Sequence, residues 1–139
     1  MARLDAYHYV VKNALINDGW TITDDPYVIE FGDVRMQADL GAEKVFAAEK
    51  QNRQIVIEVK VFDGPGSFIS KLHGATGQYG NYRSLLQKIS PERKLYLAIS
   101  QRAYLDYFCS VGVQAIIAHQ QIKLIVFDPK TEEILQWTD

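Results

Sequence analysis

The sequence predicts a single α/β domain in which a mixed β-sheet is flanked by helices. Its 139 residues are enough to bury one hydrophobic core, and an apolar content of 47% is ordinary for a globular protein. The expected elements run helix, several strands, helix, strand, short helix, strand, strand. Helices and strands alternate in the second half of the chain, which favours parallel pairing there. Because no repeat or linker divides the chain, we expect one domain over residues 1–139.

The first half of the chain predicts one helix followed by short strands. Residues 5–18 carry an apolar stripe at helical spacing, and Gly19 is a suitable helix stop. The following strands are separated by turns rich in Asp, Gly and Pro. They are expected at residues 20–23, 27–31, 34–40, 43–50 and 54–62, the last two forming a hairpin that turns at 51–53.

The second half predicts a long helix and three further strands. The helix is expected at residues 67–89, where Gly74, Gly77 and Gly80 recur at three-residue spacing. Each glycine costs about 1 kcal/mol of helix propensity relative to Ala, and the spacing predicts close packing of this face on the sheet. Strands are expected at residues 95–100, 124–127 and 134–137, with a short helix at 103–108.

Charge is unevenly distributed along the chain, although the formal net charge is only −2. Residues 24–49 contain seven acids and two bases, whereas residues 83–102 contain five bases and one acid. Two solvated faces would explain this pattern, and so would a metal-collecting acidic pocket beside a basic rim that attracts phosphate. No apolar run reaches the roughly 20 residues that span a bilayer. The lone Cys109 and the absence of a signal-peptide core at the N-terminus predict a cytoplasmic protein.

A charged pair interrupts the most apolar of the predicted strands. In residues 54–62 the side chains alternate between two faces, so Glu58 and Lys60 share one face with Val56 and Phe62. Burying a carboxylate and an ammonium costs free energy unless they pair with each other or bind a metal. The pair is therefore the first candidate for chemistry in this sequence.

Asp39 is the candidate third member of this site. It lies nineteen residues before Glu58, a distance that fits one intervening hairpin, so the two carboxylates can converge on adjacent strands. Two carboxylates supply the oxygen ligands that Mg²⁺ or Mn²⁺ prefers, with water and a substrate phosphate completing the coordination. Lys60 is then expected to orient a water molecule or to stabilise charge on the phosphate.

A second polar pair lies on the predicted helix at 67–89. Gln78 and Tyr82 are four residues apart and therefore share one helix face. They are suited to position a ligand or a DNA backbone at the sheet. The pair is also compatible with an ordinary amphipathic helix, in which Tyr82 packs on the sheet and Gln78 meets solvent.

Together these residues resemble the PD-(D/E)xK nuclease superfamily, whose members have a restriction-endonuclease-like core. The pattern is Asp39, then Glu58-x-Lys60, then Gln78-x-x-x-Tyr82, the last element being similar to nuclease domains of the RecB type. The whole chain more closely resembles the XisH family of cyanobacterial fdxN-element excision controlling factors. The stretches that carry this resemblance are residues 5–20, 38–44, 47–50, 57–60, 77–79, 95–98, 125–129 and Trp137. Two departures from the pattern are Ala38, where the superfamily often has Pro, and Val61, where the family often has Ser.

The resemblance implies a role in DNA recombination during excision of a DNA element. It implies a catalytic set of Asp39, Glu58, Lys60, Gln78 and Tyr82, with Mg²⁺ or Mn²⁺ held by Asp39 and Glu58, and cleavage of DNA phosphodiester bonds. The expected partners are DNA, a XisI-like companion protein and a separate site-specific recombinase, with no membrane; a homodimer is also left open.

Two other functions remain open from the sequence. The first is a non-catalytic accessory factor that binds DNA, the recombinase or the XisI-like partner and keeps the charged residues as a buried network. The second is one component of a toxin–antitoxin or defence pair. The sequence also leaves open whether Asp5, His8, Glu43 or Glu49 joins the site.

Overall fold

The computed structural model describes residues 3–46 and 51–138. A six-stranded sheet with the order β1-β4-β5-β6-β7-β8 forms its centre, and β2 and β3 form a separate two-stranded sheet. The helices and strands are α1 (Arg3–Asn17), β1 (Thr21–Asp24), β2 (Tyr27–Phe31), β3 (Val34–Ala38), β4 (Leu40–Phe46), β5 (Gln51–Val59), α2 (Phe68–Ile89), β6 (Lys94–Ser100), α3 (Gln101–Ala103), the π-helical turn η1 (Tyr104–Phe108), α4 (Val111–His119), β7 (Leu124–Asp128) and β8 (Glu133–Trp137).

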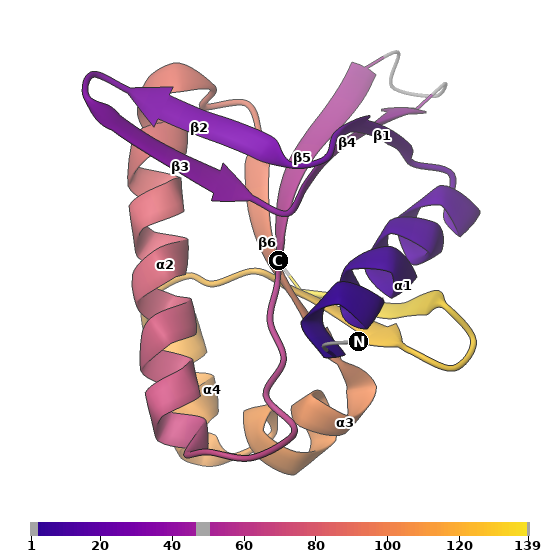
Figure 1. The fold of residues 1–139 in the computed structure, drawn as a ribbon, viewed down its shortest axis with the longest axis vertical. Helices are drawn as coiled ribbons and strands as arrows, with labels where there is room; N and C mark the ends of the chain where they lie inside the picture. Colours follow the sequence, from indigo (N-terminus) through magenta and orange to yellow (C-terminus); the bar gives the residue numbers. More distant parts are fainter. Residues whose placement is uncertain (1–2, 47–50, 139) are drawn as a thin grey trace.

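The central sheet is mixed, as the sequence predicts. Strands β4 and β5 pair antiparallel, β5, β6 and β7 pair parallel, and β8 returns antiparallel to β7. The parallel pairs require a crossover, and the long helix α2 supplies it between β5 and β6. Figure 1 shows α1 on one side of the sheet and α2 with α4 on the other, while the β2–β3 hairpin crosses the upper end of α2.

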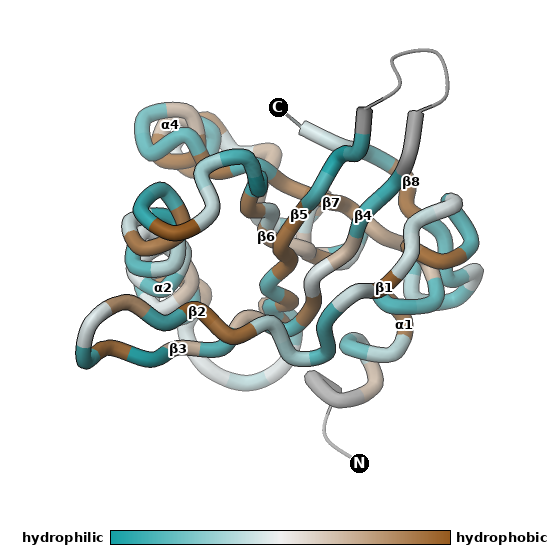
Figure 2. The backbone as a smooth tube through the Cα atoms, turned by 90° about the horizontal axis from the view of Figure 1, so that it is seen from above, coloured by the Kyte–Doolittle hydropathy of each residue, from teal (hydrophilic) through white to brown (hydrophobic). Residues whose placement is uncertain are grey.

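Two apolar layers hold the sheet between its helices, and β5 contributes to both. The central strands are the most hydrophobic part of the backbone in Figure 2. Val56 and Phe62 pack with Leu72 and Leu86 of α2, whereas Ile55, Ile57 and Val59 pack on the α1 side. The alternation predicted for residues 54–62 is therefore confirmed. It places Glu58 on the α2 side of the sheet.

Helix α2 begins where the sequence predicts, after Ser67, whose side chain accepts a hydrogen bond from the backbone N–H of Ser70. The prediction that its glycines pack closely on the sheet is wrong. A Cβ atom placed on Gly74, Gly77 or Gly80 would meet nothing within 4 Å. The helix instead buries Leu72, Ala75, Tyr79, Tyr82 and Leu86, so the glycines lie on its open face.

The structure differs from the sequence-based elements in several places, and the strand expected at 54–62 ends already at Val59. The strand expected at 34–40 is interrupted at Asp39, which separates β3 from β4. Strand β5 already begins at Gln51, so the expected turn at 51–53 belongs to the strand, and residues 47–50 lie outside the described part of the chain. Helix α4 was not anticipated; it is capped by Ser110 and buries Val113 and Ile117. Among the described residues, no helix has both the length and the apolar character needed to cross a membrane.

Candidate metal-binding site on the central sheet

Asp39 occupies the single-residue junction between β3 and β4. The first paired residue of β4, Leu40, lies opposite Ile57, so the next position in register sets Asp39 beside Glu58. The backbone N–H of Val59 donates a hydrogen bond of 2.7 Å to Asp39 Oδ2. This bond fixes the Asp39 carboxylate against the end of β5. The structure thus brings together the two carboxylates that the sequence analysis paired.

Glu58 is one of two buried polar residues in the described core, with a relative exposure of 7%. The pKa of its carboxyl group is raised from 4.5 to about 8, and burial is the largest cause. The negative charge of Asp39 and a hydrogen bond with its side chain also raise the pKa, whereas Lys60 and the backbone of Asp39 lower it. Glu58 and Asp39 therefore interact directly, and the charge of Asp39 disfavours ionisation of Glu58.

Lys60 follows β5 on the same face as Glu58. Its backbone N–H donates to the carbonyl of Ala98 at 3.1 Å, which keeps this segment alongside β6 beyond the end of β5. Lys60 Nζ lies 3.7 Å from Glu58 Oε2, and the lysine side chain is 30% exposed. Lys60 is therefore open to solvent on the side away from Glu58, which leaves its ammonium accessible to an anionic ligand.

Gln78 and Tyr82 lie on the α2 face that is turned toward this site. Gln78 Nε2 donates to the Tyr82 hydroxyl at 2.8 Å, and the hydroxyl donates to the carbonyl oxygen of Gln37 at 2.8 Å. Burial and the nearby charge of Glu58 raise the pKa of Tyr82 to about 12. These two hydrogen bonds connect α2 to Gln37 of β3, two residues before Asp39. The raised pKa keeps the Tyr82 hydroxyl protonated, so it remains a hydrogen-bond donor.

His8 contacts Asp39 from α1, which lies on the other side of the sheet from α2. Its Nδ1 lies 3.5 Å from Asp39 Oδ1, and its Nε2 lies 2.8 Å from Asp25 Oδ1. Lys12 donates to the other oxygen of Asp25 at 2.7 Å, and this bond is the main cause of the lowered pKa of Asp25. The sequence analysis left His8 open and missed Asp25. Helical spacing could have predicted that His8 faces the sheet. His8 lies three residues before the buried Val11, and residues at that spacing share one helix face.

Glu43, another residue that the sequence left open, is not part of this cluster. Glu43 lies on β4 four residues after Asp39, or about 13 Å along the strand. The side chain of Asp5 and all of Glu49 lie outside the described residues. In the part of the chain that the structure describes, no three His, Cys, Asp or Glu side chains are grouped so that they could hold a metal ion. Any cation here would be held by the two carboxylates Asp39 and Glu58 together with other oxygen ligands, such as backbone carbonyls or water.

Comparisons with known proteins give the family. A family model described as XisH protein matches residues 1–135. The chain belongs to the XisH family. It is similar to the crystal structure of an fdxN element excision controlling factor protein from Anabaena variabilis, with 41% identity, a TM-score of 0.89 and coverage of 97% of this chain and 99% of that one. It is also similar to an XisH family protein from Nostoc punctiforme PCC 73102, with 40% identity, a TM-score of 0.88 and coverage of 97% and 100%. No curated protein matches the sequence.

Proposed function

We propose that this XisH family protein cleaves DNA phosphodiester bonds with the help of a divalent metal ion, using a site of the PD-(D/E)xK type. The observation that carries the proposal is the direct interaction of Asp39 and Glu58 on adjacent strands, with Lys60 next on the same face. Two carboxylates and a lysine at the end of a central strand provide a cation site beside a cationic group. That combination suits an anionic phosphodiester substrate.

The residues present fit Mg²⁺ or Mn²⁺. Both cations prefer oxygen ligands and keep several waters when bound by few carboxylates. Without a cation, the negative charge of Asp39 disfavours ionisation of Glu58 and contributes to its raised pKa. Asp39 and Glu58 would hold the metal. When bound, the metal would polarise the phosphate and lower the pKa of a coordinated water.

The remaining residues have distinct supporting roles in this proposal. The ammonium of Lys60 is partly exposed and would contact a non-bridging phosphate oxygen or orient the attacking water. His8 and the Val59 N–H contact separate oxygens of Asp39 and so fix its carboxylate plane. Gln78 and Tyr82 act one step further away, because they hold the Gln37 carbonyl and with it the strand that leads to Asp39.

The family suggests where this chemistry would be used. The Anabaena variabilis relative is described as an fdxN element excision controlling factor. We propose that the present chain likewise controls excision of a DNA element, acting on DNA together with a XisI-like companion and a separate recombinase. One observation favours the non-catalytic accessory role instead. The described residues contain no group of three metal-ligating side chains, so the proposed metal would depend on water and DNA for most of its coordination.

Cleavage of single-stranded, duplex and branched DNA in Mg²⁺ or Mn²⁺, with and without the XisI-like companion, tests the proposal. The parent would be compared with Glu58→Gln, Lys60→Met and the matched control Glu92→Gln, which removes an exposed carboxylate outside the site. Cleavage by the parent and the control that is lost in both site variants supports a nuclease. DNA binding without cleavage by the folded parent would refute it in favour of the accessory role.

A further inference from the structure

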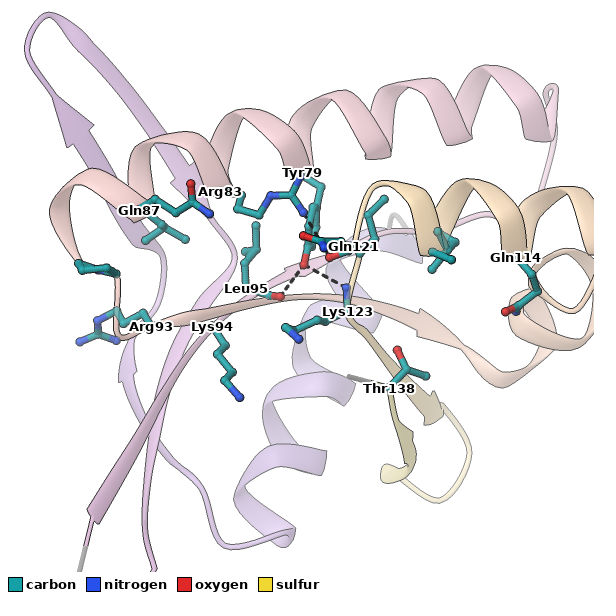
Figure 3. Close-up of a pocket in the computed structure, with 15 residues that line it drawn as sticks. Tyr79, Arg83, Gln87, Arg93, Lys94, Leu95, Gln114, Gln121, Lys123 and Thr138 are labelled. Carbon is teal, nitrogen blue, oxygen red and sulfur yellow. Dashed lines mark hydrogen bonds between the residues drawn. The ribbon is translucent and has the colours of Figure 1, made fainter.

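A second candidate site lies on the α2 side of the sheet, near the beginnings of β6 and β7. A pocket of about 640 Å³ opens between the C-terminal half of α2, the end of α4 and the beginnings of β6 and β7. In Figure 3, Tyr79, Arg83, Gln121 and Lys123 gather at its centre. A volume of this size is typical of sites for small organic ligands.

The lining of the pocket is strongly cationic in a chain whose formal net charge is −2. Arg83, Arg93, Lys94 and Lys123 line it, and the described lining residues include no Asp or Glu. Three of these cations belong to the basic run at residues 83–102, which the sequence analysis related to phosphate. Figure 3 shows Arg93 and Lys94 extending away from the centre, and the guanidinium of Arg93 lies 4.9 Å from the Tyr27 ring. The pocket therefore keeps Arg83 and Lys123 near its centre for an anion, with Lys94 at its rim (Figure 3).

Arg83 is already held in place for such a ligand. Its Nη1 donates to the carbonyl oxygens of Gln120 and Gln121, and its guanidinium lies 5.5 Å from the centre of the Tyr79 ring. Both hydrogen bonds use one nitrogen, so Nη2 and Nε keep their N–H groups for an anionic oxygen, counting partners among the described residues only. The Tyr79 hydroxyl is also fixed, since it donates to the Leu95 carbonyl at 2.7 Å and accepts from the Lys123 N–H at 3.0 Å. A preorganised cation of this kind binds phosphate without first losing conformational freedom.

The rest of the lining is suited to an apolar group that has polar edges. Leu86, Leu95, Ile117 and Ile122 provide a buried apolar wall. The amides of Gln87 and Gln121 add donors and acceptors, whereas the Gln114 amide is engaged with the Phe108 carbonyl. We infer that this pocket binds a nucleotide unit, with its phosphate on Arg83 and Lys123, Lys94 adding positive charge at the rim, and its base against the apolar wall. The unit is either a free nucleotide or one nucleotide of a DNA strand.

This pocket is separate from the acidic site. Leu95 pairs in register with Val56, so the pocket lies at the beginning of β6, while Glu58 lies two residues further along β5. On α2, Tyr82 is directed toward the acidic site, whereas Tyr79, about one turn earlier, lines the pocket. None of the proposed catalytic residues lines the pocket. The inference therefore stands whether or not the protein cleaves DNA.

Calorimetric titration in EDTA, where no metal-dependent cleavage occurs, tests the inference. The probes are deoxyadenosine monophosphate, adenosine, inorganic phosphate and a short single-stranded oligodeoxyadenylate. The pocket variant is Lys94→Gln/Lys123→Gln, and the matched control is Lys88→Gln/Lys130→Gln, which removes the same charge from exposed positions outside the pocket. Glu58→Gln is included to report binding at the acidic site. Lys123→Gln alone serves if the double variant fails to fold.

The expected result is one mononucleotide bound per chain, more tightly than adenosine or phosphate alone. The pocket variant should bind at least about tenfold more weakly, because it loses charge-assisted hydrogen bonds, while the Lys88→Gln/Lys130→Gln control should bind like the parent. A tighter complex with the oligonucleotide identifies a DNA strand as the source of the unit, and equal affinity identifies the free nucleotide. Three results would overturn the inference: no binding of any nucleotide, equal weakening in the control, or binding of phosphate as tight as that of the nucleotide.

Discussion

The titration of Glu58 makes its replacement by glutamine a quantitative test of the site. Folding raises the pKa of this carboxyl group from 4.5 to about 8, mainly because the group is buried. Since the folded-state pKa lies above the unfolded-state pKa, folding favours the protonated form. The contribution of Glu58 to stability is therefore complete below about pH 4.5 and is lost as the pH rises through about 8. A shift of roughly 3.5 pKa units corresponds to at most about 5 kcal/mol of unfolding free energy.

Glu58→Gln keeps the size of the side chain but cannot ionise, so the variant should not lose this stability. We expect its unfolding free energy to rise relative to the parent by several kilocalories per mole between pH 5 and pH 9, within the limit of about 5 kcal/mol. Urea denaturation in EDTA at pH 5, 7 and 9 measures the difference. The exposed control Glu92→Gln should differ from the parent by no more than about 0.5 kcal/mol at each pH. A difference between Glu58→Gln and parent that is the same at all three pH values would refute the assignment of Glu58 as a buried, protonated carboxyl group.

Three further predictions follow from the same structure. Mn²⁺ binding at pH 7 should release a proton from Glu58, because a carboxyl group whose pKa is raised to about 8 is mostly protonated there. Calorimetry in buffers of different ionisation enthalpy measures this release, and zero release would exclude Glu58 as a ligand. Tyr82→Phe should lower the unfolding free energy by about 1–3 kcal/mol, because the Gln37 carbonyl loses its donor; an unchanged urea midpoint would contradict the role of this bond. Gly77→Ala should instead raise thermal stability by about 0.5–1 kcal/mol, since its Cβ meets open space; a lower melting temperature would contradict that reading.

Much of the fold could be predicted because its signals are local. The period-two alternation in residues 54–62 correctly assigned the apolar side chains of Ile55, Val56, Ile57 and Val59 to their faces, which places Glu58 on the α2 side. The spacing also allowed Asp39 to return beside Glu58, but the register came only from the structure, because the turn expected at 51–53 is part of β5. Helix α4 was missed even though Ser110 caps it, and the glycines of α2 were misread. Spacing shows that residues share a face, but it does not show whether another element covers that face.

The sequence by itself determined the mixed α/β class and the alternation of β5, and it allowed Asp39 to converge with Glu58 and Lys60. These features depend on periodicity and on the cost of burying charge, which are properties of short segments. Only the tertiary structure decided that His8 contacts Asp39 and that Arg83 and Lys123 share a pocket. Those contacts join elements far apart in the chain, and their geometry depends on how each helix packs against the sheet. Local patterns do not encode the angle and depth of that packing, so the neighbours of His8 and the basic pocket emerge only in the folded molecule.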